Sequence, residues 1–380
     1  MNHMKHLPHV TAFRTLSNFM TQVVLFFLGI YFTQIELTGI QQGILFAVYP
    51  LIGIVSAVPI GLLNDRAYPR TLIAIGYLLI ATQYLAITQT TDFYALIGLF
   101  TLGSLGAQLN QLSLDAFFYK NSDHQKPKQT GSYVGTFLSG SGLGIILGGL
   151  LLEKVPFTGM FLGIAITALG ASVLSQIILP KTEVFHFEFH LYKKDIQKPA
   201  ILLFATLIFL WTLHMSSEVT SYGLFLRENL GLSYTGMGFY MGLAILTMII
   251  WARWAGHLIH HGTPIRYIVY AGLFFSGVGH FIVTVPMVEI SILGRIIHEA
   301  GDAFMFVFLY DGVRKLFPIE RAGGNSGIIR FIQNGALILG VLAFAPLGKT
   351  YGNAYPLIIA STFSILAIPI AIRFRHLIKH

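Results

Sequence analysis

Apolar stretches long enough to cross a lipid bilayer recur from one end of this chain to the other. A membrane-spanning helix needs about 20 consecutive, mostly apolar residues, and breaks at glycine, proline and charged residues divide the chain into such stretches. We expect twelve spans, which use most of the 380 residues and leave no room for a sizeable soluble domain. The predicted spans are residues 12–35, 40–63, 71–90, 93–118, 130–152, 157–179, 200–226, 233–254, 266–285, 288–313, 324–347 and 354–373.

Composition and the placement of charge point to the same class of protein. Only 11% of the residues are charged, whereas a soluble domain carries about a quarter. The net charge of +8 is spread over short connections between apolar segments, where basic residues act as topology signals, so we expect no nucleic-acid partner. The chain has no cysteine, which excludes disulfides and thiolate metal sites. We therefore expect an all-α integral membrane protein, embedded in lipid and monomeric.

Lysine and arginine collect on one side of the predicted membrane. With both termini in the cytoplasm, most of the 24 basic side chains fall in the tails and loops on the cytoplasmic side. Such an excess of positive charge marks the cytoplasmic face. We expect a multi-pass protein with both ends in the cytoplasm, located in the cytoplasmic (inner) membrane of a bacterium.

The two halves of the chain repeat each other. Residues at a nearly constant offset of 195 or 196 are Gly61 with Gly256, Asp115 with Asp311, Gly131 with Gly327 and Gly144 with Gly340. A duplication of six spans explains this offset. We predict an N-terminal half at 1–179, a polar cytoplasmic linker at 180–198 and a C-terminal half at 199–380.

The connection between the second and third predicted spans carries a charged motif, formed by Gly61, Asp65, Arg66 and Arg70. This segment resembles the signature loop between helices two and three of the major facilitator superfamily, and it lies in the corresponding connection. One departure is Tyr68, which stands where the family usually has glycine. The resemblance implies that family's fold, with twelve helices in two pseudo-symmetric six-helix halves and a central cavity that opens to one side at a time.

The resemblance also implies that this loop latches the cytoplasmic side. Asp65 would lie at the start of span eleven, near Gly323 and Gly324, where a carboxylate suits the positive end of the helix dipole. Arg66 would pair with Asp115 at the end of span four. The alternative is that these charges only set the orientation of the chain.

Charged side chains inside the spans are costly and therefore informative. Arg295, Glu299 and Asp302 share one face of span ten at helical spacing, and Glu218 lies in span seven. Burial and like charges raise the proton affinity of a carboxyl group, whereas a nearby arginine lowers it. We predict proton coupling through these four residues, and the alternative is a buried ion pair that only neutralises itself.

Polar residues on the four spans that the resemblance assigns to the cavity predict a substrate site. We expect it to be formed by Arg14, Asn18, Gln22, Gln108, Gln111, Trp211, His214, His298, Arg330 and Asn334. A polar cavity favours a small polar organic solute. A basic residue from each half, Arg14 and Arg295, favours an anionic or zwitterionic one.

The remaining patterns exclude other chemistries. The clusters His3, His6, His9 and His257, His261 lie at the membrane edge, so we predict no metal site and no cofactor. The chain has no nucleotide-binding loop, so pumping by ATP is not expected. We predict a proton-coupled secondary transporter, not an enzyme. The alternatives are a multidrug or siderophore-type proton antiporter, which a partial glycine-rich exporter motif in span five favours, and more remotely a transporter-like sensor or membrane-embedded enzyme.

Overall fold

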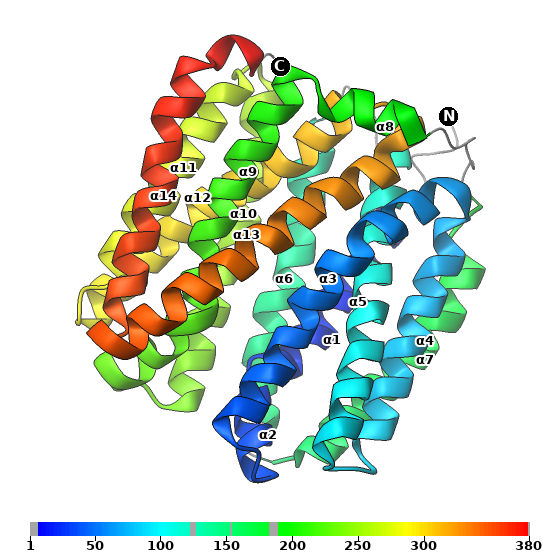
Figure 1. Cartoon of the computed structure of the whole chain (residues 1–380), viewed down its shortest axis with the longest axis vertical. Coiled ribbons are helices and arrows are strands. Elements are labelled where there is room, and N and C mark those ends of the chain that lie inside the picture. The colour runs from blue at the N-terminus through cyan, green and yellow to red at the C-terminus, as the bar shows by residue number, and fades with distance from the viewer. Residues whose placement is uncertain (1–6, 122–126, 153, 182–188, 379–380) are drawn as a thin grey trace. The chain divides into compact units, whose positions relative to one another are not determined.

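The computed structural model describes residues 7–121, 127–152, 154–181 and 189–378. All regular secondary structure in these residues is helical. The long helices and their short connections are shown in Figure 1. They are α1 (Leu7–Leu25), α2 (Leu28–Gln34), α3 (Gly39–Arg66), α4 (Pro69–Ile87), α5 (Phe93–Asn121), α6 (Pro127–Leu152), α7 (Phe157–Ile178), α8 (Phe189–Ile196), α9 (Pro199–Ser217), α10 (Tyr234–His260), α11 (Ile265–Val283), α12 (Val288–Leu316), α13 (Ala322–Tyr351) and α14 (Ala354–Arg373).

Most of these helices have the length and composition of membrane spans. Within the described residues, 10 helices are long and apolar enough to cross a bilayer. The helix α12 is 29 residues long, but the charged residues near its middle make it less apolar than the others. The predicted span 12–35 is divided into α1 and α2 by a turn at Phe26 and Phe27. Together these helices account for the predicted spans, and the all-helical fold class is confirmed.

Local sequence signals set several helix ends. Proline occupies the first turn of α4 and α9, where its missing N–H costs no hydrogen bond. Thr38 and Gln41 form a capping box at the start of α3. Gly262, with φ of +90°, follows the end of α10 in a conformation that favours glycine.

By contacts between residues, the chain divides into two compact units. Unit 1 comprises Met1–Ser122, Leu143–Phe189 and Pro318–Asn334, and unit 2 comprises Asp123–Gly142, His190–Phe317 and Gly335–His380. In unit 1, α4 packs against α5 and α7; in unit 2, α11 packs against α12 and α14. Each of α6 and α13 belongs to unit 1 over one part and to unit 2 over the other, so the contact units differ from the predicted halves at 1–179 and 199–380. The sequence boundary between halves stays a prediction.

The internal repeat is visible as the same close helix crossing in each unit. In unit 1, a Cβ atom on Gly61 would lie 2.6 Å from the carbonyl oxygen of Gly323 and 2.8 Å from Cα of Gly327. In unit 2, a Cβ atom on Gly131 would lie 3.0 Å from Cα of Gly256. Gly61 matches Gly256 in the repeat and Gly131 matches Gly327, so α3 approaches α13 as α10 approaches α6. Small residues permit this close backbone contact between membrane helices.

Replacing Gly61 with valine should lower the thermal stability of the purified protein. The new Cβ would meet backbone atoms of α13, and overpacking of this kind costs about 1–3 kcal/mol. Gly98→Val on α5 is the matched control, because nothing lies within 4 Å of a Cβ at Gly98. Thermal unfolding in detergent compares the two variants. An equal loss in both would show that valine's helix propensity, and not the crossing, sets the cost.

Candidate functional site

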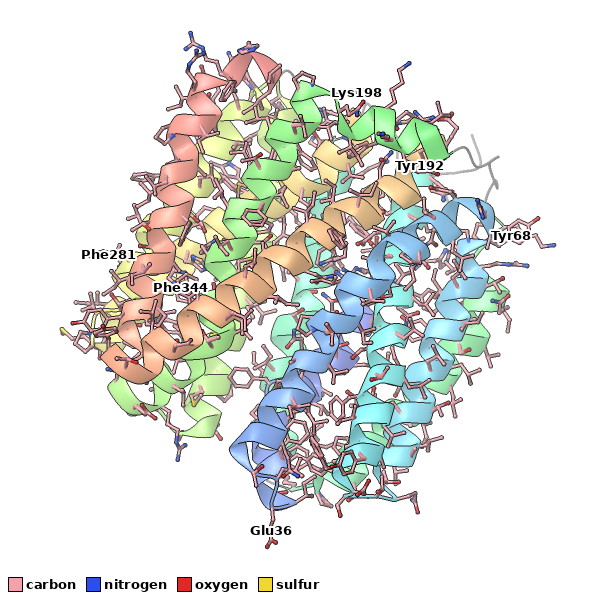
Figure 2. The ribbon with its side chains drawn as sticks, viewed as in Figure 1. Glu36, Tyr68, Tyr192, Lys198, Phe281 and Phe344 are labelled. Carbon is pink, nitrogen blue, oxygen red and sulfur yellow. The ribbon has the colours of Figure 1, made fainter. Side chains whose placement is uncertain are left out.

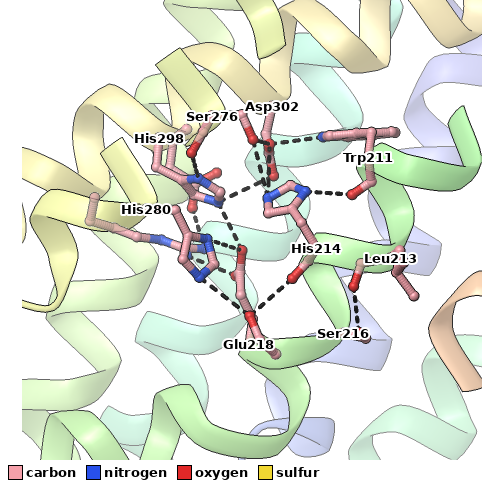
Figure 3. A network of polar contacts seen from close by, with 12 residues as sticks. Trp211, Leu213, His214, Ser216, Glu218, Ser276, His280, His298 and Asp302 are labelled. Atoms are coloured by element: carbon pink, nitrogen blue, oxygen red, sulfur yellow. Dashed lines mark hydrogen bonds and ion pairs between the residues drawn. The ribbon is translucent and has the colours of Figure 1, made fainter. Parts of the chain in front are cut away.

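A cluster of buried polar and charged side chains lies inside unit 2, on α9, the segment η2 (Glu218–Tyr222) that follows it, α11 and α12 (Figure 3). Arg295 on α12 joins two of its carboxylates. Its Nη1 donates to Oε2 of Glu218 at 2.7 Å, and its Nη2 pairs with Oε1 of Glu299 at 2.6 Å. Arg295 also lies over the ring of Tyr222, 4.8 Å from the centroid. A single buried guanidinium group thus connects the two glutamates.

Asp302 is held by hydrogen bonds from two other helices. Its Oδ1 accepts from Nε1 of Trp211 on α9 at 2.9 Å and from Oγ of Ser276 on α11 at 2.8 Å. Its Oδ2 lies 3.4 Å from Nε2 of His298, one turn earlier on α12. The four residues that the sequence predicts for proton coupling therefore lie in one cluster.

Three imidazole rings complete the cluster. His214, His280 and His298 lie with ring centroids 4.8–5.4 Å apart. Nε2 of His298 is 2.8 Å from Oε1 of Glu218, and Nδ1 of His280 is 3.8 Å from the same oxygen. With neutral imidazoles, the three carboxylates and the guanidinium of this cluster leave a formal charge of two negatives.

Two local features of the sequence build this arrangement. Glycines bring α11 and α12 together, since a Cβ on Gly301 would lie 2.6 Å from the carbonyl oxygen of Gly272 and one on Gly279 would lie 2.8 Å from that of Gly294. Beyond Ser217, α9 continues as the π-helical segment η2 (Glu218–Tyr222). Such π-bulges are frequent at functional sites, and this one begins at the glutamate that faces the imidazoles.

Sequence reasoning missed His280 and Ser276. Both lie in the predicted span 266–285, one helical turn apart, and their side chains are buried. A histidine inside a span is costly in lipid, and that signal identifies His280 without a structure. What the sequence lacks is the partner, because His280 meets Glu218 only through the packing of α11 against its neighbours.

A second polar cluster lies inside unit 1. Arg14 on α1 donates from Nη1 to Oδ1 of Asn18 at 2.9 Å, and its Nε lies 3.3 Å from Oδ1 of Asp115. The amide orientation that satisfies both ends of Gln111 turns its oxygen to two guanidinium groups. That oxygen then accepts from Nη2 of Arg14 at 3.2 Å and from Nη1 of Arg330 at 3.1 Å. Two arginines from different helices thus converge on one amide.

Other predicted cavity residues divide between the two units. Gln108 and Asn334 both lie against Gly53 of α3 in unit 1. Gln108 is buried, and neither its amide oxygen nor its nitrogen has a hydrogen-bond partner among the described residues; the same holds for Nδ2 of Asn334. Gln22 lies instead against Gly144 of α6. Trp211, His214 and His298 belong to the unit 2 cluster described above.

The signature loop places Asp65 at the start of α13, within unit 1. Its carboxylate accepts from the backbone N–H groups of Gly323 and Gly324 at 3.0 and 2.6 Å, and Nζ of Lys120 lies 3.7 Å away. Arg70 donates from Nη1 to the carbonyl oxygen of Leu179 at 3.4 Å.

Two further residues of the same region show what surrounds the loop. Tyr68, at the family's glycine position, is exposed at the edge of the molecule in Figure 2, with Nζ of Lys181 5.7 Å from its ring centroid. Asp115 forms its ion pair with Arg14. Arg66 is exposed, and its pairing with Asp115 stays a prediction.

Long apolar helices with charged groups buried among them define an integral, multi-pass membrane protein. A sequence profile of the Major Facilitator Superfamily matches residues 11–341, and the chain belongs to this superfamily. It is a membrane transporter and not an enzyme. No match to a curated protein was found.

Solved structures show the same fold along the whole chain. The crystal structure of the human organic anion transporter MFSD10 is 15% identical and covers 97% of this chain and 99% of its own, with a TM-score of 0.80. A bacterial homologue of the iron transporter ferroportin, in an outward-facing state, is 16% identical over 97% of this chain and 99% of its own, with a TM-score of 0.78. At these identities the likeness concerns the fold alone.

Proposed function

We propose that this protein moves a small anionic or zwitterionic organic solute by alternating access, coupled to the movement of protons. The observation that carries the proposal is the unit 1 cluster, where Arg14 and Arg330 converge on Gln111. Planar guanidinium groups bind carboxylates and phosphates through paired hydrogen bonds. With Asp115 as the acid beside them, these three charged groups keep a formal surplus of one positive charge.

Unpaired buried amides in unit 1, both against Gly53, support a polar ligand. A buried polar group without a partner costs about 1–3 kcal/mol, and Gln108 and Asn334 carry three such atoms. A solute with a carboxylate and further polar groups would satisfy them. One of the similar structures is of an organic anion transporter and the other is of a homologue of an iron transporter. The fold therefore does not determine the solute, and the side chains must do so.

The unit 2 cluster supports coupling to protons. Arg295 contacts Glu218 and Glu299 at once, so a proton on one glutamate leaves the other paired with the guanidinium. The formal surplus of two negative charges is buried, and burial of uncompensated charge is costly. Proton uptake offsets that charge, and proton release to the other side of the membrane would drive the solute.

Arg330→Gln should weaken binding of the transported anion about 10- to 100-fold, because a hydrogen bond to a charged group contributes about 1.5–3 kcal/mol. The measurement is a thermal-shift screen of the purified protein against carboxylates, phosphorylated metabolites, amino acids and cationic drugs. A ligand at 100 times its Kd adds about 2.7 kcal/mol of stability.

The matched control for this variant is Arg227→Gln, which removes an exposed arginine from unit 2. It should keep the full shift of every anion that stabilises the unsubstituted protein. Stabilisation by hydrophobic cations alone, or an anion shift that survives in Arg330→Gln, would contradict the proposed substrate class and favour a multidrug exporter.

A further inference from the structure

We propose that His214, Glu218, His280 and His298 form a binding site for one divalent transition-metal ion. Each of these four residues offers one ligand atom, and the four atoms all lie within 4.8 Å of one another (Figure 3). The residues come from α9, the segment η2, α11 and α12, all within unit 2. The proposal concerns a metal that binds here and goes beyond the transported solute. It replaces the expectation from sequence that the chain has no metal site.

The spacing of the ligand atoms suits a metal. In the tetrahedral geometry of zinc, bonds of about 2.0–2.2 Å to nitrogen or oxygen place two ligands about 3.3–3.6 Å apart. The most distant pair, within 4.8 Å, therefore needs to close by about an ångström. Rotations of the imidazole rings and of the Glu218 side chain would supply that movement.

Two of the imidazoles are oriented by backbone carbonyl groups. Nδ1 of His298 lies 2.9 Å from the carbonyl oxygen of Ser276, and Nδ1 of His214 contacts the carbonyl oxygen of Trp211. A carbonyl oxygen only accepts, so each Nδ1 carries a hydrogen and each Nε2 faces the cluster. There Nε2 of His298 meets Oε1 of Glu218 and Nε2 of His214 meets Oγ of Ser276, so a metal that binds these nitrogens would displace their protons. Metal-ligating histidines are held in this way, with the second nitrogen donating to a carbonyl or carboxylate.

The third imidazole, of His280, has one ring nitrogen without a hydrogen-bond partner among the described residues. Nε2 of His280 lies 3.3 Å from Oγ of Ser217. Its Nδ1 is buried, has no hydrogen-bond partner among the described residues, and points at Oε1 of Glu218 from 3.8 Å. That separation is too long for a hydrogen bond. Two ligands of one metal ion in a tetrahedral site lie about 3.3–3.6 Å apart, so these two atoms need to close by only a few tenths of an ångström.

The charge of the surroundings matches a dication. Glu218, Glu299 and Asp302 with Arg295 carry a formal surplus of two negatives when the imidazoles are neutral. Glu218 divides its two oxygens, with Oε2 toward Arg295 and Oε1 toward the imidazoles. A metal at Oε1 would replace the contact of this oxygen with Nε2 of His298, while Oε2 holds the arginine. A bound divalent ion brings the cluster to zero.

The chemical types of the four ligand atoms indicate which class of metal ion would bind. Three imidazole nitrogens and one carboxylate oxygen suit Fe²⁺, Co²⁺, Ni²⁺ and Zn²⁺. Mg²⁺ and Ca²⁺ take oxygen ligands and are expected to be rejected. The proposal stands whether or not the same carboxylates carry the transported proton, because it concerns equilibrium binding and not flux.

The test begins with a full-length reference protein that lacks other histidine clusters. His3, His6, His9, His257, His260 and His261 are replaced by alanine, and the protein is purified without a histidine tag. Co²⁺ is then titrated into the protein in detergent. Visible absorption reports the coordination of the ion, and calorimetry reports stoichiometry and affinity, with Mg²⁺ and Ca²⁺ as comparison ions.

We expect one Co²⁺ per chain, with the intense visible bands of a site of low coordination number, and no binding of Mg²⁺ or Ca²⁺ at the same concentration. His280→Gln and Glu218→Gln should each weaken Co²⁺ by no less than the roughly 10- to 100-fold that loss of an outer ligand partner costs. Ser291→Ala is the matched control, since Ser291 is a buried residue of α12 that hydrogen-bonds Tyr240 and no ligand.

Three results would overturn the proposal. The first is absence of Co²⁺ and Zn²⁺ binding to the reference protein, which needs no ligand variant. The second is equal affinity in the reference protein, His280→Gln and Glu218→Gln. The third is an equal loss in Ser291→Ala, which would assign the effect to unit 2 as a whole. None of these results bears on binding of an anion near Arg330, so the two proposals fail separately.

Discussion

Glu299→Gln should abolish accumulation of the solute driven by a pH gradient while leaving solute-for-solute exchange intact. Glu299 is 2% exposed, and Nη2 of Arg295 lies 2.6 Å from its Oε1. Glutamine keeps the shape and the hydrogen-bonding oxygen but cannot carry a proton. Net transport needs a proton to cross with the solute, whereas exchange does not. The expected loss is therefore complete for one assay and small for the other.

Liposomes that contain the purified protein allow both assays on one preparation. Glu218→Gln and Asp302→Asn belong in the same series, because each removes another carboxylate from the cluster. Glu289→Gln is the matched control, since Glu289 is exposed in the first turn of the same helix. If all three cluster variants keep gradient-driven accumulation, protons are not the coupling ion. Loss of exchange in all three would instead indicate damage to the fold.

The spans were predictable because their signals are local. Runs of apolar residues of fixed length between glycine, proline and charge identify a helix in lipid without knowledge of its neighbours. The interruption between α1 and α2 and the π-helical segment after Ser217 were not predictable. Both lie inside predicted spans and change the regular hydrogen-bond ladder of a helix, a change that hydropathy does not record.

In the two polar clusters too, the sequence predicts contacts between residues close in the chain but not contacts between different helices. Arg295 with Glu299, and His298 with Asp302, are one turn apart on α12, so helical spacing alone brings each pair together. Contacts between helices need the fold. Helical spacing gives no hint that Arg14 meets Asp115, or that Arg330 and Arg14 share one amide.

The internal repeat predicted which positions of the two halves are equivalent, but not which residues pack against each other. Four pairs of positions at a constant offset predicted a duplication, and two of those pairs form the equivalent glycine crossings of the two units. The offset indicated that these glycines are equivalent. It did not indicate that Gly61 touches Gly327, because a repeat relates positions in the two halves and says nothing of contacts.

Asp65→Asn should slow transport severely while the protein still inserts into the membrane. The Asp65 carboxylate accepts from two backbone N–H groups at the start of α13, at 3.0 and 2.6 Å, and each bond to a charged group contributes about 1.5–3 kcal/mol. An asparagine can accept from one of these groups but turns an NH₂ donor toward the other. The favourable charge at the positive end of the helix is lost as well.

We expect the large loss of flux in Asp65→Asn because this helix cap is buried. A second, exposed cap in unit 1 tests that explanation. Asp92 accepts from the N–H of Ala95 at 2.8 Å at the start of α5, but it is exposed to solvent. Asp92→Asn should therefore leave flux nearly unchanged at matched expression. Lys120→Met, combined with Asp65→Asn, should cost less than the sum of the two single changes, because Lys120 pairs with the same carboxylate. Flux at the unsubstituted level in Asp65→Asn would show that the contact only orients the chain in the membrane.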